Sequence, residues 1–168
     1  WAFIASYTRA ARAAGHEVTI VSSDKDLMQL VGDSVSLYDT MKDEIIGPAQ
    51  VIDKFGVPPA QVGEVLALMG DAADNVPGVK GVGPKTASDL IRDFGSVEGV
   101  IAAIPTIKKP KLRETLANSI DMARLSRALV QLKDDLPLPA PLDALALQAP
   151  PHEPLAAFLA RHGFRAML

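Results

Sequence analysis

Residues 70–87 constrain the fold of this chain most, because they hold a dense set of glycines and carboxylates between two helix-forming segments. They read Gly-Asp-Ala-Ala-Asp-Asn-Val-Pro-Gly-Val-Lys-Gly-Val-Gly-Pro-Lys-Thr-Ala. Asp71 and Asp74 stand three positions apart, so at a helix end they would project side by side and repel unless a cation lies between them. Gly81 and Gly83 precede a helix-forming run, where a missing Cβ lets a phosphate approach the backbone amides. Carboxylates followed by such amides predict a nucleic acid backbone as the ligand.

The composition excludes several classes of protein. The 168 residues contain no cysteine, which rules out a disulfide scaffold and thiolate metal sites and fits a reducing cytoplasm. No apolar run is long enough to span a bilayer, and no signal-peptide layout is present. We therefore expect a cytoplasmic protein with no membrane partner.

The charge is unevenly distributed along the chain. The formal net charge is −3, yet residues 76–113 hold seven Lys and Arg against three Asp and Glu, so 7 − 3 = +4 there and −7 elsewhere. A basic segment on an acidic body is typical of a protein that holds a phosphate backbone in one place. A solvated helical surface would give the same pattern.

The first part of the chain has the pattern of an α/β unit. An Ala-rich helix over residues 1–15 ends at Gly15, and residues 17–23 form a β-branched run of strand length. Asp24 and Asp26 follow in a polar turn, before a helical pattern resumes at residues 27–31. Ligands bind at the carboxyl ends of strands in open parallel sheets, which is where these aspartates stand.

The remaining pattern is mostly helical. Residues 34–38 alternate as a second strand, and residues 41–46 either pair with it or form a short excursion. The expected helices are 48–55, 61–69, 86–94, 97–104, 112–130 and 154–162. We expect an α/β part over residues 1–69 and a helical region over residues 70–168. Its Pro-rich stretch 134–153 either wraps the body or serves as a linker.

The four aspartates have an ordinary explanation and a functional one. Asp24 or Ser23 could cap the following helix, and Asp71 and Asp74 could mark a helix terminus. Two pairs, each followed by a new helix, favour a metal site, and we expect all four to converge on one acidic pocket. With no Cys, and with His16, His152 and His162 scattered, oxygen ligands predict Mg²⁺ or Mn²⁺ over Zn²⁺. Such clusters suit two-metal phosphodiester hydrolysis.

Residues 81–87 resemble a helix–hairpin–helix element. A phosphate there would meet the amides beside Gly81 and Gly83, the Lys85 ammonium and the Thr86 hydroxyl together. This mode reads the backbone and not the bases, and the hairpin carbonyls could also hold a monovalent cation. A plain structural turn is the alternative.

Together these motifs resemble a known family. Ser-Ser-Asp-Lys-Asp-Leu-Met-Gln-Leu-Val, the stretch at 70–87 and the following Leu-Ile-Arg-Asp-Phe-Gly-Ser-Val are similar to the 5′→3′ exonuclease domains of bacterial DNA polymerase I, in the flap endonuclease superfamily. The resemblance covers nearly the whole chain. It implies a PIN/5′ nuclease-like fold followed by a helix–three-turn–helix element, with Asp24, Asp26, Asp71 and Asp74 as metal-site carboxylates.

The same resemblance implies the ligands and partners. Gly81, Gly83, Lys85 and Thr86 would grip duplex DNA with a 5′ flap or nick, and Lys80 and Arg113 are plausible backbone contacts. It also implies two Mg²⁺ or Mn²⁺ ions in the complete enzyme, a polymerase module in the same polypeptide and a nucleoid-associated location. Only the C-terminal portion of the family pattern is matched, since Trp1, Ala2 and Phe3 stand where acidic residues are expected, so we expect impaired cleavage by these residues alone.

Two main hypotheses follow. In the first, the chain is part of a metal-dependent 5′ nuclease that trims flaps in replication and repair. In the second, it is a non-catalytic module that holds duplex DNA without cutting it. The four aspartates favour the nuclease, because a pure binder gains little from negative charge near phosphates. A protein-binding helical scaffold is the third possibility, which the basic segment disfavours.

Overall fold

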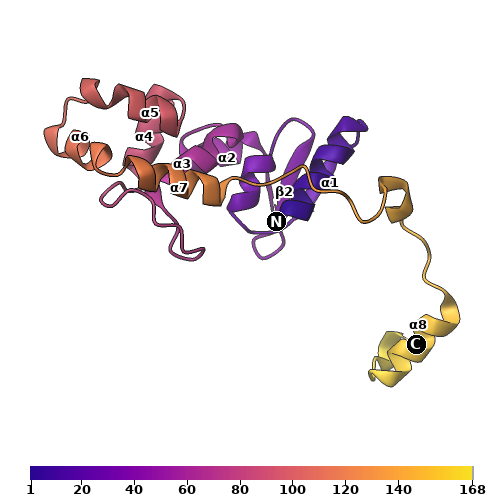
Figure 1. Cartoon of the computed structure of the whole chain (residues 1–168). Helices are drawn as coiled ribbons and strands as arrows, with labels where there is room; N and C mark the ends of the chain where they lie inside the picture. Colours follow the sequence, from indigo (N-terminus) through magenta and orange to yellow (C-terminus); the bar gives the residue numbers. More distant parts are fainter. Residues whose placement is uncertain (168) are drawn as a thin grey trace. The chain divides into compact units, whose positions relative to one another are not determined.

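The computed structural model describes residues 1–167, which form two compact units divided after Leu138. The first unit begins with a helix and a small sheet, and the sheet is succeeded by helices (Figure 1). Its elements over residues 1–69 are α1 (Ala2–Ala13), β1 (Val18–Val21), the 3₁₀ helix η1 (Asp26–Leu30), β2 (Val35–Asp39), β3 (Glu44–Ile46), α2 (Pro48–Phe55), η2 (Pro59–Gln61) and α3 (Val62–Met69).

The sheet has three strands in the order β1–β2–β3. Strands β1 and β2 run parallel, with Ile20 opposite Leu37, and both of these side chains are buried. Strand β3 pairs antiparallel with β2, so residues 41–46 do form a partner strand, and the sheet is mixed. The expected helix after Asp26 is a 3₁₀ helix. The α/β class predicted from the sequence is confirmed.

Helix α3 is the centre of the first unit. It is apolar on nearly every side, and its buried residues are Val62, Val65, Leu66, Ala67 and Leu68. A helix without a polar face has to be covered all round. The structure covers α3 with α4 (Pro84–Phe94) and α7 (Ile120–Val130), as well as with η1 from the sheet side.

The helical region also contains α5 (Val97–Ala103), η3 (Ile104–Thr106) and α6 (Pro110–Ala117). The expected single helix over 112–130 is wrong, because α6 ends at Ala117 and α7 starts at Ile120. Ser119 precedes α7 with φ −122° and ψ 17°, outside the helical range, which interrupts the helical ladder. Asn and Ser are poor residues for a helix interior because their side chains compete for backbone hydrogen bonds.

The second unit contains η4 (Leu142–Leu145), α8 (His152–Arg161) and η5 (Arg165–Met167). Leu159 is buried in it, and the rings of Phe158 and His162 are in tilted contact, with centroids 4.5 Å apart. The Pro-rich stretch begins in the first unit, where the Leu136 amide donates to Ser6 Oγ on α1 at 3.1 Å. Across residues 1–167, every helix is too short or too polar to cross a bilayer.

A close glycine contact closes the loop after α3. Gly70 ends α3 with φ +75°, and Gly78 has φ +63°. A Cβ built on Gly78 would lie 2.3 Å from the Gly70 nitrogen, so the two backbones touch with no room for a side chain. A positive φ adds a second cost for any other residue.

We expect Gly78→Ala to lower the free energy of unfolding by about 3 kcal/mol or more, because backbone overlap adds to the strain of a positive φ. Gly32→Ala is the matched control, since a Cβ at Gly32 has open space and its φ is ordinary. Urea unfolding followed by circular dichroism measures both. Equal stability of the two variants would contradict the close packing.

Candidate metal centre and phosphate-binding hairpin

The loop after α3 presents two aspartates on a closed frame. Asp71 and Val76 form an isolated antiparallel bridge, with the Asp71 N–H donating to Val76 O at 2.9 Å and the Val76 N–H donating to Asp71 O at 2.8 Å. Asn75 adopts φ +56° inside the loop, and Asp71 Oδ1 accepts from the Ala73 N–H at 3.0 Å. The aspartates therefore lie on a tight loop beyond the helix, not on a helix end as the sequence spacing implied.

The second pair follows β1. The Asp24 N–H donates to Ser22 Oγ at 3.1 Å, and Asp24 Oδ1 in turn accepts from the Asp26 N–H at 2.9 Å. This turn leads the chain from the carboxyl end of β1 into η1 and buries Asp26. Asp24 itself is half-buried, and its side chain closes the turn onto the backbone two residues further on.

Asp26, Asp71 and Asp74 come together, and we call them the acidic cluster. One carboxylate oxygen of each lies within 4.8 Å of the others. Asp26 and Asp71 are buried, whereas Asp74 is exposed. The structure thus brings the turn after β1 and the loop after α3 together. Asp24 is not one of these three residues.

Lys25 enters the cluster, which the sequence reasoning did not anticipate. Its ammonium makes an ion pair with Asp71 and lies 4.0 Å from Asp74 Oδ2. The signal for it was its position between Asp24 and Asp26, in a turn that points at the cluster. This contact raises the pKa of Lys25, chiefly through the bond to Asp71.

The two buried carboxylates respond to the site in opposite directions. Burial, and then the charge of Asp24, raise the pKa of Asp26 to about 6. Burial also opposes ionisation of Asp71, but the Lys25 ammonium and the Ala73 N–H outweigh it, so the pKa of Asp71 falls below its ordinary value. Asp26 is the group that lacks a counter-charge of its own.

The donor set fits a hard divalent cation. Asp26 Oδ1 is buried and has no hydrogen-bond partner within the described chain, a costly arrangement unless something else contacts it. All the available ligand atoms in the cluster are carboxylate oxygens, which Mg²⁺ and Mn²⁺ prefer. A cation beside Asp26 would remove both the orphaned oxygen and the repulsion among three carboxylates.

The hairpin between the loop and α4 carries the phosphate-binding candidates. The Val82 N–H donates to Val79 O at 2.9 Å, Gly81 has φ +87°, and Gly83 is the N-cap of α4. Pro84 takes the first helical position, so the free amides of this helix end belong to Lys85 and Thr86. Gly81 and Gly83 are exposed, which leaves the backbone of the hairpin open.

The basic candidates around this hairpin lie at the surface. Lys80, Lys85 and Arg113 are exposed and, within residues 1–167, take part in no ion pair. Thr86 is half-buried and lines a surface cavity of about 490 Å³ with Lys108 and Lys109, which precede α6. Arg113 belongs to α6, so the candidate contacts come from two elements.

The raised pKa of Asp26 gives a test in the absence of divalent cations. The pKa lies above the unfolded value of 3.8, so this group favours the folded state below about pH 4, and the advantage is lost as the pH rises through about 6. Asp26→Asn removes the cost of ionisation and should add roughly 2 to 3 kcal/mol to the free energy of unfolding at pH 7.

The difference between variant and wild type should grow from pH 4 to 6, as measured by urea unfolding in a chelating buffer. Asp33→Asn, at an exposed position, is the control and should change little. With Mg²⁺ present the advantage of Asp26→Asn should shrink, because the cation favours the wild-type carboxylate. A variant less stable than wild type at pH 7 without metal would refute this assignment.

Comparison with known proteins places this geometry in context. Residues 3–56 match the model of the 5′-3′ exonuclease N-terminal resolvase-like domain, and residues 57–153 match that of the 5′-3′ exonuclease C-terminal SAM fold. DNA polymerase I of Rhizobium leguminosarum is 51% identical over 156 residues, which cover 93% of this chain and 15% of the relative. DNA polymerase I of Bacillus caldotenax is 42% identical over 167 residues, covering 96% of this chain and 19% of the relative. The chain thus spans less than a fifth of the length of these relatives.

Solved structures agree with the sequence matches. The 5′-exonuclease of phage T5 with bound zinc superimposes with a TM-score of 0.69 at 27% identity, covering 77% of this chain and 49% of that one. A T5 flap endonuclease variant in complex with DNA and metal ions gives a TM-score of 0.70 at 27% identity, covering 78% and 49%. Because residues 3–56 and 57–153 match models of the N-terminal and C-terminal domains of one family in order, this chain belongs to the 5′-3′ exonuclease family found at the N-terminal region of bacterial DNA polymerase I.

Proposed function

We propose that this chain is part of a metal-dependent 5′ nuclease that hydrolyses phosphodiester bonds near the 5′ end of flapped or nicked duplex DNA, in replication and repair. The observation that carries the proposal is the acidic cluster with its orphaned Asp26 oxygen. Its relatives are DNA polymerases I, and a solved relative is described with DNA and metal ions.

The acidic cluster would hold the divalent cation. Asp26 and Asp71 offer buried oxygens, and Asp74 offers an exposed one on the side open to substrate. Asp24 accepts the Asp26 N–H with Oδ1, which leaves its Oδ2 for a second cation or its water shell. When bound, Mg²⁺ or Mn²⁺ lowers the pKa of an attacking water and stabilises charge on the phosphate.

The hairpin would hold the duplex by its backbone. Amides at the start of α4, the Lys85 ammonium and the Thr86 hydroxyl converge on one anion, with Gly81 and Gly83 leaving space for it. Lys80 and Arg113 would extend the grip to neighbouring phosphates. The carbonyls around Gly81 are the place for a monovalent cation. This recognition is independent of sequence, as a nuclease that acts on structure requires.

The wider context is also proposed. The relatives are DNA polymerases I and far longer than this chain, so we infer a polymerase module in the same polypeptide. Solved relatives are described with metal ions, and we infer two cations in the complete enzyme. The part of the site described here is one group of three carboxylates, sized for a single ion. We therefore expect residues 1–168 alone to cut weakly, because two-metal catalysis fails steeply when one ion is missing or misplaced.

One observation favours the alternative, a DNA-binding module that does not cut. The Lys25 ammonium already gives Asp71 and Asp74 a cationic partner, so the cluster could be a structural ion-pair network. It leaves Asp26 Oδ1 unsatisfied, however, and a purely structural network would be expected to satisfy that atom.

Asp71→Asn separates these functions, since it keeps the Oδ1 acceptor for the Ala73 N–H while it removes a charge. We expect Mn²⁺ binding, measured by titration calorimetry, to weaken by at least tenfold. In the full-length parent protein, cleavage of a 5′-flapped duplex with Mn²⁺ should fall by at least a hundredfold. Asp33→Asn is the control. Unchanged metal binding and cleavage in Asp71→Asn would rule out the metal centre, whereas DNA binding without any cleavage by the parent would support the alternative.

Lys85→Ala tests the hairpin. It should weaken binding to every duplex sequence alike and reduce the slope of log K against log salt by about 0.9, the share of one phosphate. Lys133→Ala removes the same charge from an exposed residue already near Asp135, and should leave the slope nearly unchanged. Fluorescence anisotropy of a labelled duplex, at salt concentrations from about 50 to 200 mM, measures the affinity and its slope. An affinity that varies with sequence but hardly with salt would refute the phosphate grip.

A further inference from the structure

Ser126 is a fully buried polar side chain that forms a hydrogen bond with a residue distant in the sequence. It lies on α7 with 0% of its surface exposed, and its Oγ accepts a hydrogen bond from the Gly78 N–H at 3.0 Å. The two residues are 48 positions apart. A hydroxyl placed this deep would cost free energy without a partner, so its position depends on this contact.

Gly78 is the junction between the two candidate sites. The bridge that closes the aspartate loop ends at Val76, and the hairpin starts at Val79, whose N–H donates to Leu68 O on α3 at 2.8 Å. The tight contact between Gly78 and Gly70 leaves the junction no lateral freedom. A displacement of Gly78 would therefore move Asp71 and Asp74 on one side and the hairpin on the other.

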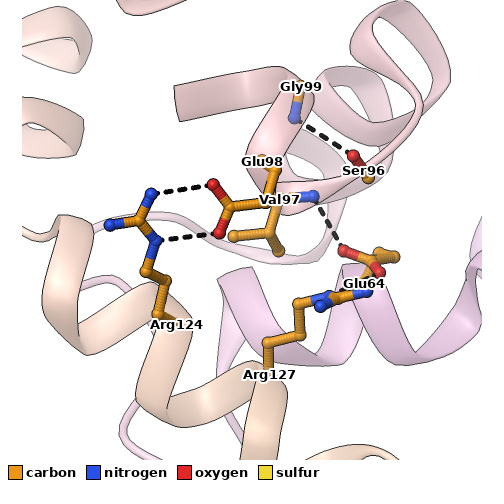
Figure 2. A network of polar contacts seen from close by, with 7 residues as sticks. All are labelled: Glu64, Ser96, Val97, Glu98, Gly99, Arg124 and Arg127. Atoms are coloured by element: carbon orange, nitrogen blue, oxygen red, sulfur yellow. Dashed lines mark hydrogen bonds and ion pairs between the residues drawn. The ribbon is translucent and has the colours of Figure 1, made fainter. Parts of the chain in front are cut away.

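Two arginines near Ser126 in the sequence, Arg124 and Arg127, tie α7 to its neighbours through ion pairs (Figure 2). Arg127 Nε donates to Glu64 Oε1 on α3 at 2.7 Å, and the other oxygen of Glu64 accepts from the Val97 N–H at the start of α5. Arg124 makes two bonds of 2.8 Å to Glu98 on α5. Ser126 thus lies on a helix that is tied to α3 and α5.

From this geometry we propose that Ser126 is a positioning residue for the metal centre: its bond to Gly78 sets where Asp71 and Asp74 stand relative to Asp26. The inference rests on the proposed function, because it takes the acidic cluster as the cation site. Asp26 comes from the other side of the site, after β1, so only the placement of the aspartate loop brings the cluster to within 4.8 Å. Ser126 touches neither substrate nor cation and acts through the Gly78 amide.

Ser126→Ala in the full 168-residue chain is the test. We expect Mn²⁺ affinity, measured by titration calorimetry well below the unfolding temperature, to fall about tenfold, as it does when other supporting partners of metal ligands are removed. Hydrogen exchange of the Gly78 amide should accelerate in the same variant. Ser126→Thr, which keeps the hydroxyl, should retain affinity within about threefold of wild type.

Val100→Ala is the control for lost stability, since Val100 is buried on α5 and makes no bond to the loop. It should lower the melting temperature while it leaves Mn²⁺ affinity unchanged. The inference is overturned if Ser126→Ala binds Mn²⁺ as wild type does, or if Val100→Ala weakens binding as much. Failure of wild type to bind Mn²⁺ at all would overturn the proposed function as well, which separates the two failures.

Discussion

The burial of α3 is the constraint on which the first unit depends. Because the helix is apolar on nearly every side, it has to be enclosed, and the sheet side, α4 and α7 supply the enclosure. Its end is therefore fixed in space, and the chain leaves it at Gly70 in a single direction. Both candidate sites are built on that exit. The aspartate loop follows at once, and the hairpin follows it, so the placement of two polar sites is decided by the packing of an apolar helix.

Electrostatics then divides labour among the carboxylates. Asp71 has Lys25 and the Ala73 N–H, which keep it ionised, whereas Asp26 has burial and like charges, which disfavour its ionised form. A cation would therefore stabilise Asp26 more than Asp71, because the Asp71 carboxylate already has an ammonium partner and the Asp26 carboxylate does not. Such unequal neighbours are typical of functional sites, since a purely structural cluster is under no pressure to keep an unsatisfied oxygen.

Local patterns predicted the fold well, and the contacts between distant segments poorly. The β-branched run before Asp24 predicted strand β1 because composition and length are local properties, although Ile20 is the one buried residue of that strand. Gly83 preceded a predicted helix for the same reason. The break at Asn118 and Ser119 was missed because apolar spacing continues across it. The convergence of Asp26 with Asp71 was expected from two aspartate pairs that each precede a new helix. The place of Lys25 and the contact of Ser126 depend on the folded arrangement of distant segments, which no spacing reveals.

The short chain segment through Gly78 also limits the distance between the two candidate sites. Gly81 stands seven positions after Asp74 (81 − 74), and an extended chain of that length reaches at most about 25 Å. Duplex DNA rises about 3.4 Å per base pair, so in the proposed complex the reacting phosphate lies within about seven base pairs of the hairpin contact. In an enzyme built this way, the distance between the hairpin and the carboxylates would fix the position of the cut, and no base sequence would have to be read.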